Sequence, residues 1–184
     1  MPEPFFTIGP STRPIAEFID LLRHSGVWLV VDVRTIPRSL RNPQFSADAL
    51  AKSLADHQIE YDRIAALGGL RSKSRDVPPE SNAFWSNQSF HNYADYAMTE
   101  PFQHGIALLR ELGDAQRCAI MCAEALWWRC HRRIIADYLL AAGEIVFHIL
   151  EMDHVEEATI TPAAQLGPND ILTYPVRNSA AAAP

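Results

Sequence analysis

Short apolar runs alternate along this chain with longer stretches in which apolar residues recur at helical spacing. Each run is rich in β-branched or aromatic residues and is bounded by Gly, Pro or polar residues, which predicts strands buried on both faces of a parallel sheet. The four clearest runs span residues 4–9, 27–34, 117–123 and 144–150. A weaker strand, carrying charges, is expected at 59–64.

Helical periodicity fills the segments between these strands. It predicts helices over about residues 14–24, 47–57, 93–112 and 130–142. Pro101 is expected to divide the third helix into two, because proline inside a helix removes a hydrogen bond. Strands and helices in alternation predict an α/β fold, namely a three-layer, Rossmann-like open sheet, mostly parallel, with helices on both faces.

A single α/β domain is expected over residues 1–160, since a chain of 184 residues suits one core. Residues 71–89 lack periodicity and predict a long loop, either a functional flap or a mobile segment. Residues 151–161 are expected to hold a short turn of helix. Residues 161–184 are rich in Pro and Ala and predict a C-terminal tail that either docks on the surface or is disordered.

The formal net charge of −6 argues against a broad, non-specific nucleic-acid binder, although it leaves room for a local basic cleft. Three cysteines, an odd number with no signal peptide in front of them, predict free thiols in a reducing cytoplasm. No apolar run approaches about 20 residues, so no membrane span is expected. The oligomeric state stays open, a homodimer included.

Candidate anion-binding residues follow the second strand. Asp32 stands inside an apolar run, where a carboxylate needs a partner, and Arg34 comes directly after it. Ligands of open α/β sheets bind outside the carboxyl ends of the strands, and arginine suits bidentate capture of phosphate or carboxylate. We expect a small anionic ligand to be held by Arg34, Arg38, Arg71 and Arg132, with Asp32 and Ser39 in support.

Candidate catalytic residues lie where the strand at 117–123 ends and the next helix begins. Cys122 is either a nucleophile, with a pKa lowered by the helix N-terminus and by His131 or Arg132, or a buried strand cysteine. Glu124 is either a general acid or base or a salt-bridged carboxylate. His131 is either a proton shuttle or a ligand, or else a histidine satisfied by a loop carbonyl at the start of the helix.

Four of these side chains offer zinc ligands in principle: Cys122, Glu124, Cys130 and His131. The spacing of the cysteines is not a familiar zinc signature, and adjacent residues such as Cys130 and His131 diverge by about 100° on a helix. No metal or other cofactor is therefore predicted, and Cys130 is given a supporting role. Trp127 and Trp128 either stack on a base or, as we favour, pack the loop.

Five short segments together resemble a known family. They are Thr7-Ile-Gly9, Val31-Asp-Val-Arg34 with Pro37 and Ser39, Leu67-Gly-Gly69 with Arg71, Cys122-Ala-Glu124, and Cys130-His-Arg132. Over residues 5–150 the chain is similar to the bacterial and archaeal domain of unknown function DUF488. The resemblance implies a Rossmann-like α/β fold and a set of candidate residues, but no reaction. That family often has a histidine after the first segment, where Pro10 stands here.

A looser likeness connects the chain to rhodanese and phosphatase-like domains, which also have a strand ending in Cys, then a loop and an Arg-bearing helix. The loop after Cys122 contains no glycine, although a phosphate-cradling loop normally needs small residues. This likeness is an analogy of fold and carries no function.

Three functional hypotheses follow. The first is an enzyme acting on a phosphate- or carboxylate-bearing small molecule at the C-terminal edge of the sheet, with Glu124 and His131 moving protons and Cys122 as nucleophile. The alternative is a non-catalytic nucleotide- or nucleic-acid-binding module that uses the same arginines, nucleic acid being less favoured. The third is a purely structural buried ion network: Asp32, Arg34, Glu124 and Arg132.

Overall fold

The computed structural model describes residues 3–177 and has a six-stranded main sheet with strand order β3-β2-β4-β1-β5-β6. All neighbours are parallel except β5 and β6, which form an antiparallel hairpin at one edge. The strands are β1 (Phe5–Ile8), β2 (Leu29–Asp32), β3 (Glu60–Arg63), β4 (Cys118–Met121), β5 (Val146–Glu151) and β6 (His154–Glu157).

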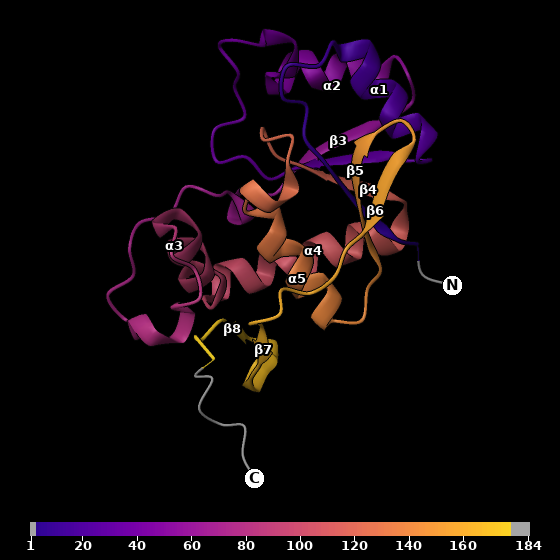
Figure 1. Cartoon of the computed structure of the whole chain (residues 1–184). Helices are drawn as coiled ribbons and strands as arrows, with labels where there is room; N and C mark the ends of the chain where they lie inside the picture. The colour runs from indigo at the N-terminus through magenta and orange to yellow at the C-terminus, as the bar shows by residue number, and fades with distance from the viewer. Residues whose placement is uncertain (1–2, 178–184) are drawn as a thin grey trace.

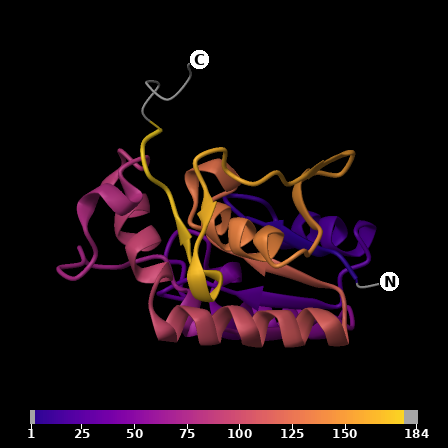
Figure 2. The same ribbon diagram turned by 90° about the horizontal axis from the view of Figure 1, so that it is seen from below.

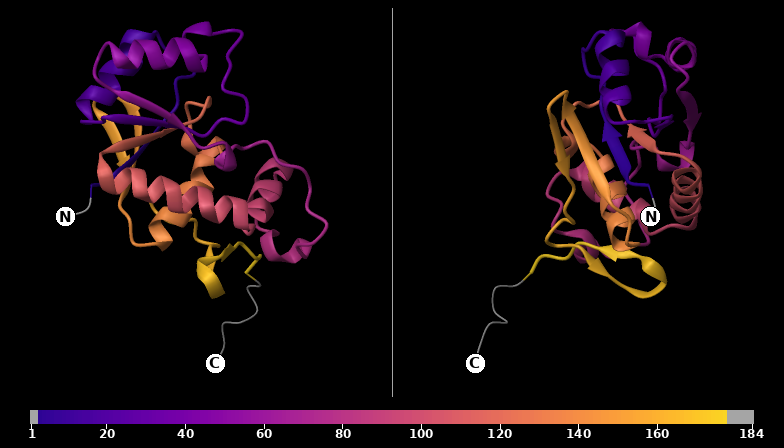
Figure 3. Two further views of the ribbon diagram at one scale, coloured as in Figure 1. Left: turned by 180° about the vertical axis from the view of Figure 1, so that it is seen from behind. Right: turned by 90° about the vertical axis from the view of Figure 1, so that its right-hand side faces the viewer.

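Helices cover both faces of the sheet, as Figures 1 and 3 show. Helices α1 and α2 lie on one face, α4 and α5 lie on the other, and α3 packs beside α4. Their bounds are α1 (Ile15–His24), α2 (Ala47–Ala55), α3 (Gln88–Ala97), α4 (Glu100–Ala115) and α5 (Arg132–Ala141). The prediction of a three-layer α/β fold with a mostly parallel sheet is confirmed. None of the helices within residues 3–177 is long and apolar enough to cross a membrane.

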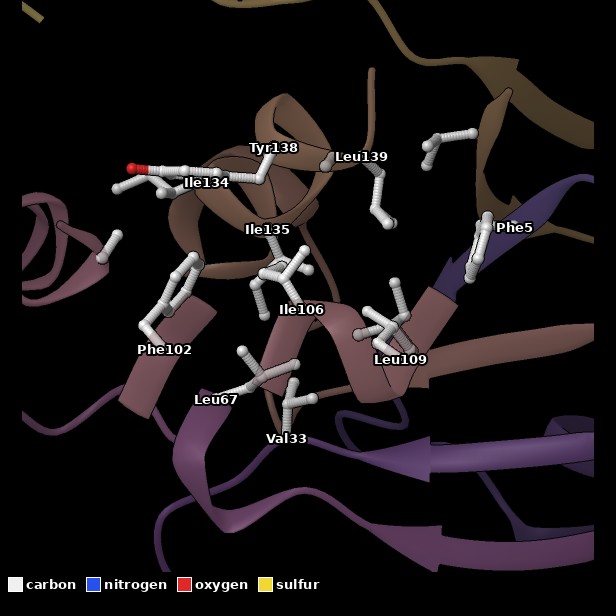
Figure 4. Close-up of a cluster of buried hydrophobic side chains, with 14 of the residues drawn as sticks. Phe5, Val33, Leu67, Phe102, Ile106, Leu109, Ile134, Ile135, Tyr138 and Leu139 are labelled. Carbon is white, nitrogen blue, oxygen red and sulfur yellow. The ribbon is translucent and has the colours of Figure 1, made fainter. Parts of the chain in front are cut away.

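Two buried clusters fix these layers, because alternate residues of each strand point to opposite faces. Phe6 and Val30 pack with the apolar stripes of α1 and α2. Phe5 and Val31 pack with those of α4 and α5. Figure 2 shows α4 running along the sheet, and Figure 4 shows side chains of α4 and α5 meeting over it. The side chains labelled there from the two helices are Phe102, Ile106, Leu109, Ile134, Ile135, Tyr138 and Leu139.

The strand order determines where a crevice opens at the carboxyl edge of the sheet. β2 and β4 are neighbours in register, with Asp32 opposite Met121. After β2 the chain leads to α2 on one face, and after β4 it leads to α5 on the other face. Where two adjacent parallel strands send their connections to opposite faces, a crevice opens outside their carboxyl ends. The loops that begin at Val33 and Cys122 form its two sides.

Two local expectations need comment. Pro101 lies in the first turn of α4, where its missing N–H costs nothing, so the long helical stretch breaks just before it, between α3 and α4.

The turn of helix expected over 151–161 is instead the edge strand β6. Most side chains of His154–Glu157 are exposed, and charged, exposed edge strands give no apolar alternation from which a strand can be predicted.

The C-terminal segment up to residue 177 docks on the domain, which is the first of the two alternatives for the predicted tail. It carries two short paired strands, β7 (Gln165–Leu166) and β8 (Leu172–Thr173). Asp137 on α5 accepts a hydrogen bond from the Thr161 backbone N–H at 2.8 Å and another from the Tyr174 hydroxyl at 2.9 Å. The rest of the predicted tail, 178–184, lies outside the described residues.

The same C-terminal segment also holds the long loop at 71–89. Asn82 is fully buried, donates to Asp95 at 2.7 Å and accepts from the Tyr174 backbone N–H at 3.1 Å. The Trp85 ring lies against the Tyr174 ring, with centroids 5.1 Å apart. The loop is therefore held against the core, chiefly by the hydrogen bonds of the buried Asn82 side chain.

The Asp137 contacts predict a pH-dependent stability. Burial raises the pKa of Asp137 from 3.8 to about 6. The folded state therefore favours the protonated carboxyl, and the stability this contributes is present below about pH 4 and is lost as the pH rises through about 6. The Asp137→Asn variant keeps the polar contacts but cannot ionise.

We expect the free energy of unfolding of the wild type, relative to Asp137→Asn, to fall by up to about 3 kcal/mol between about pH 4 and pH 7. Urea unfolding at a series of pH values measures this difference. Parallel pH profiles for the two proteins would contradict the assignment.

Candidate functional site

A cavity of about 780 Å³ lies at the carboxyl end of the parallel strands, of a size that suits a small molecule. Loops that follow β1, β2, β3 and β4 all contribute to it. Apart from Phe45, its lining comes from residues 10–12, 34–36, 38–42, 69–70, 89–90, 122–124 and 129–131. The crevice expected from strand order therefore coincides with this cavity.

Asp32 holds Arg34 in place at the carboxyl end of β2. The Asp32 carboxylate accepts from the backbone N, Nε and Nη2 of Arg34 at 3.0, 2.9 and 2.7 Å. The Tyr61 hydroxyl, from β3, donates to the same carboxylate at 2.6 Å. Asp32 is fully buried and Arg34 is 5% exposed. The buried carboxylate thus has the partner that its position in the sequence required.

Arg34 remains charged and keeps one nitrogen available. Burial alone lowers the pKa of Arg34, but the hydrogen bonds and charge of Asp32 more than offset this, so the pKa lies above its usual value. Nε and Nη2 are engaged by Asp32, while Nη1 has no hydrogen-bond partner within residues 3–177. Since Arg34 lines the cavity, a positioned cationic donor is available to an anion there.

Exposed arginines add to the positive charge of the cavity. Arg38 from the predicted set lines it, and so do Arg41 and Arg129, which sequence reasoning did not single out although both lie within basic stretches. Glu124 is the one acidic residue in the lining. Four arginines, counting Arg34, against one glutamate make this region cationic in a chain whose formal net charge is −6.

Ser39 shapes the loop that carries Arg38 and Arg41. The Ser39 hydroxyl accepts from the Asn42 backbone N–H at 3.1 Å, and its own backbone N–H donates to the Ser46 hydroxyl at 3.1 Å. Ser39 also lines the cavity. Its contacts agree with a supporting position.

Arg71 does not line the main cavity. Its guanidinium donates to the carbonyls of Gly68 and Ala65 at 2.9 and 3.1 Å and lies 3.7 Å over the Tyr96 ring. It borders a smaller hollow with Gly69 instead. Arg71 therefore holds together the turn beside the cavity, and the structure does not bring it together with Arg34 and Arg38 in the cavity lining.

Arg132 is also withdrawn from the cavity, being only 1% exposed. Its guanidinium donates to the Glu124 carbonyl and, through Nε, to the sulfur of Cys130 at 3.3 Å. No carboxylate in residues 3–177 lies within ion-pair distance of it. A buried cation must be compensated locally, and the loop carbonyl and the Cys130 sulfur supply that compensation for Arg132, which does not line the cavity.

Cys122, Cys130 and His131 meet at the inner end of the cavity. Nδ1 of His131 is 3.7 Å from the sulfur of Cys122 and 3.6 Å from that of Cys130. The helix α5 begins only at Arg132, with Cys130 in extended conformation and His131 at the N-cap. The expectation that these two adjacent side chains diverge is therefore wrong, because it assumed that both belong to the helix.

The second ring nitrogen of His131 is also engaged. Nε2 lies 2.9 Å from the carbonyl oxygen of Val33, to which it donates because a carbonyl can only accept. Val33 stands between Asp32 and Arg34, so one short segment positions both the imidazole and the guanidinium. The Val33 carbonyl therefore fixes the orientation of the ring through Nε2, while Nδ1 faces the sulfurs of Cys122 and Cys130.

The two cysteines have opposite acidities. A hydrogen bond with Cys130, together with burial, raises the pKa of Cys122 well above its usual value. Burial alone raises the pKa of Cys130 too, but the hydrogen bond from Cys122 and the charges of His131 and Arg132 outweigh it and lower that pKa well below its usual value. The lowered pKa expected for Cys122 thus belongs to Cys130.

Two glycines of the sequence motifs are required by close contacts. A Cβ atom at Gly9 would lie 1.8 Å from the Glu124 carbonyl oxygen, and one at Gly69 would lie 2.5 Å from Nδ1 of His131. Real Cβ atoms do not approach so closely, so only glycine lets these loops close around the site. The glycines of the first and third motifs therefore have a steric explanation.

Trp127 packs the loop against the sheet, as we favoured for the two tryptophans. Its ring stacks on His148, with centroids 4.2 Å apart, and its Nε1 donates to Glu156. Burial and the charge of Arg132 lower the pKa of His148 to about 3, so the stacked imidazole is neutral. Trp128 is 40% exposed, and neither tryptophan lines the cavity.

The opposite acidities predict different reactivities for the two cysteines. In reduced, chelator-treated protein, the iodoacetamide alkylation rate of Cys130 should reach half its maximum well below the free-thiol pKa of about 8.5, and that of Cys122 well above it. Peptide mass mapping across a pH series measures both rates. The His131→Ala variant should raise the Cys130 midpoint; a Cys122 midpoint below that of Cys130 would contradict the assignment.

Comparison with known proteins identifies the family. The family model described as "Domain of unknown function DUF488" matches residues 14–139, which is more than half of the chain. Neither the curated proteins nor the solved structures gave a significant match. The matched range contains β2, β4 and the residues that form the thiol and imidazole cluster. The chain belongs to the DUF488 family, as its sequence motifs predicted.

Proposed function

We propose that this protein is an enzyme that binds a phosphate- or carboxylate-bearing small molecule in the cavity at the carboxyl edge of the sheet. The observation that carries the proposal is Arg34, which is buried, locked by Asp32 and left with Nη1 available at the cavity wall. A guanidinium fixed before the ligand arrives loses little conformational entropy on binding. Arg38, Arg41 and Arg129 supply a flexible cationic rim.

Glu124 is the group to which we assign proton transfer. It is exposed, its carboxylate has no hydrogen-bond partner within residues 3–177, and it lines the same cavity as Arg34. An unpaired carboxylate facing an anion site works against simple anion binding, since like charges repel. Such a residue is expected where a proton must be moved to or from the bound molecule.

The reactive centre is the group of Cys122, Cys130 and His131, which line the same cavity. Buried sulfur atoms next to a cationic binding site are more than an anion-binding module needs. The alternative is a nucleotide- or nucleic-acid-binding module that uses the same arginines with Trp127 and Trp128. Neither tryptophan lines the cavity, and the Trp127 ring is stacked on His148 instead. We therefore favour the enzyme.

Binding of inorganic phosphate tests the role of Arg34. The Arg34→Lys variant keeps the charge but cannot make the bidentate contact to Asp32, so we expect its phosphate affinity to fall at least about tenfold. Isothermal titration calorimetry at fixed ionic strength measures this, with succinate as the carboxylate probe. The matched control is Arg110→Lys, at an exposed arginine of α4 paired with Glu144, which should bind like the wild type.

Arg38→Ala provides a variant whose fold is safe, because Arg38 is exposed. It should weaken phosphate binding by a smaller factor and reduce its salt dependence. A wild-type protein that binds neither phosphate nor succinate would overturn the proposal, as would Arg34→Lys binding phosphate as tightly as Arg110→Lys.

The Glu124→Gln variant separates the enzyme from the binding module. In the enzyme, screening of phosphate and carboxylate esters should find a turnover that this variant loses, while its phosphate affinity is kept or increased because the one negative charge of the lining is gone. Turnover at the wild-type rate in Glu124→Gln would refute the role of Glu124. Binding of short oligonucleotides without turnover of any ester would instead support the module.

A further inference from the structure

Three metal-ligand atoms converge at the inner end of the cavity. The sulfurs of Cys122 and Cys130 and Nδ1 of His131 all lie within 4.8 Å of one another. They come from two elements that the fold brings together, the end of β4 and the residues just before α5. The two chain segments are separated by the seven-residue loop whose conformation Arg132 fixes through the Glu124 carbonyl and the Cys130 sulfur.

The spacing of these atoms is that of ligands around one tetrahedral ion. With bonds of about 2.3 Å to sulfur and about 2.0 Å to nitrogen, tetrahedral zinc separates a sulfur from a nitrogen ligand by about 3.5 Å. The distances from Nδ1 of His131 are 3.7 Å to the sulfur of Cys122 and 3.6 Å to that of Cys130. Both are within a few tenths of an ångström of the tetrahedral value.

The surroundings of the three groups are those of metal ligands. Nε2–H of His131 donates to the Val33 carbonyl, which leaves the Nδ1 lone pair directed at the two sulfurs. The sulfur of Cys130 accepts from the backbone N of Arg132 at 3.4 Å and from its Nε at 3.3 Å. Ligating histidines and thiolates characteristically have such outer partners, which fix their orientation.

We propose that Cys122, Cys130 and His131 bind one zinc ion, with the fourth coordination position open toward the cavity. Two cysteines and a histidine are soft donors that suit zinc, and three protein ligands with one open position are the pattern of catalytic rather than structural zinc sites. All three residues line the cavity that Arg34 and Glu124 also line. When bound, zinc would act there as a Lewis acid on an oxygen in the fourth position.

This site goes beyond the proposed function in assigning an ion, and only one part of it rests on that function. That part is the identity of the fourth ligand, which we assign to an oxygen of the anion held by Arg34. The Val33 carbonyl that orients His131 comes directly before Arg34 in the chain, so the ion and the guanidinium are held by the same strand end.

Zinc uptake by the reduced, chelator-stripped full-length protein tests the inference. Titration against a chromophoric chelator should give one zinc per chain, and Co²⁺ should give the intense d–d bands of a tetrahedral site with a thiolate-to-cobalt charge-transfer band. Cys122→Ser, Cys130→Ser and His131→Gln should each weaken zinc binding at least about 100-fold, the upper end of the loss caused by removing an outer partner.

The matched control is Cys118→Ala, which removes the third cysteine, buried in β4 away from the cluster, and should bind one zinc normally. The Co²⁺ spectrum of the wild type needs no variant, so the test survives if a ligand variant does not fold. No zinc uptake by the wild type overturns the inference, and so does unchanged uptake by Cys130→Ser or His131→Gln. A Cys122–Cys130 disulfide that forms in place of metal binding also overturns it.

Phosphate binding to the stripped and zinc-loaded proteins separates the two proposals. If phosphate binds but zinc does not, the zinc site is refuted and the proposed anion site stands. If zinc binds but phosphate does not, the zinc site stands and the proposed function fails. Phosphate that binds tighter to the zinc-loaded protein and shifts the Co²⁺ spectrum supports the assignment of the fourth ligand; an unchanged spectrum refutes it.

Discussion

Burial of positive charge at the carboxyl edge of the sheet is the constraint on which the site depends. Two guanidinium groups, those of Arg34 and Arg132, are almost without solvent contact. Taking such a charge out of water costs several kcal/mol unless nearby groups compensate it. Arg34 is compensated by the fully buried carboxylate of Asp32. Arg132 is compensated by backbone carbonyls and the sulfur of Cys130. Burial raises the pKa of Cys130, but the hydrogen bond from Cys122 and the charges of His131 and Arg132 outweigh it and lower that pKa.

These two buried arginines have different roles on the two sides of the crevice. On the β2 side, Asp32 consumes only part of the Arg34 guanidinium and leaves a donor for a ligand. On the β4 side, the Arg132 guanidinium donates to the Glu124 carbonyl and to the Cys130 sulfur. These contacts hold the loop that brings Cys130 and His131 toward Cys122. One side therefore presents a guanidinium group and the other presents sulfur and imidazole. The topology places them opposite each other, because β2 and β4 are neighbours whose connections leave on opposite faces.

The sequence was sufficient for the α/β fold, and it brought most of the candidate site residues to the edge of the sheet where the cavity lies. Apolar runs and helical periodicity located the five parallel strands and the helices, and strand-end reasoning placed Arg34, Arg38, Cys122, Glu124 and His131 around one crevice, where the cavity lies. It missed β6, because an exposed charged edge strand has no apolar pattern. It grouped Arg71 and Arg132 with Arg34 and Arg38, although the first two do not line the cavity, since a sequence cannot tell a solvent-facing guanidinium from one that donates to nearby carbonyls.

One of the two reasons for predicting no metal was the assumption that the helix begins at Cys130, whereas α5 begins two residues later, at Arg132. Helical geometry separates neighbouring side chains only inside a helix, and α5 begins just after Cys130 and His131. Helix ends are the least predictable part of a sequence-based assignment, and here the end decides which side chains meet. Likewise, the acidities of Cys122 and Cys130 depend on the hydrogen bond between the two sulfurs and on the charges of His131 and Arg132, and spacing alone does not reveal these contacts.

The central claim is that an anion binds against Arg34 inside the cavity. The most direct measurement is anomalous X-ray diffraction from crystals soaked in tungstate, a heavy-atom analogue of phosphate. The account predicts an anomalous peak in the cavity with a tungstate oxygen within hydrogen-bond distance of Nη1 of Arg34. Tungstate bound only at arginines on the outer surface, with the cavity free of anion at a concentration that saturates phosphate binding, would contradict it.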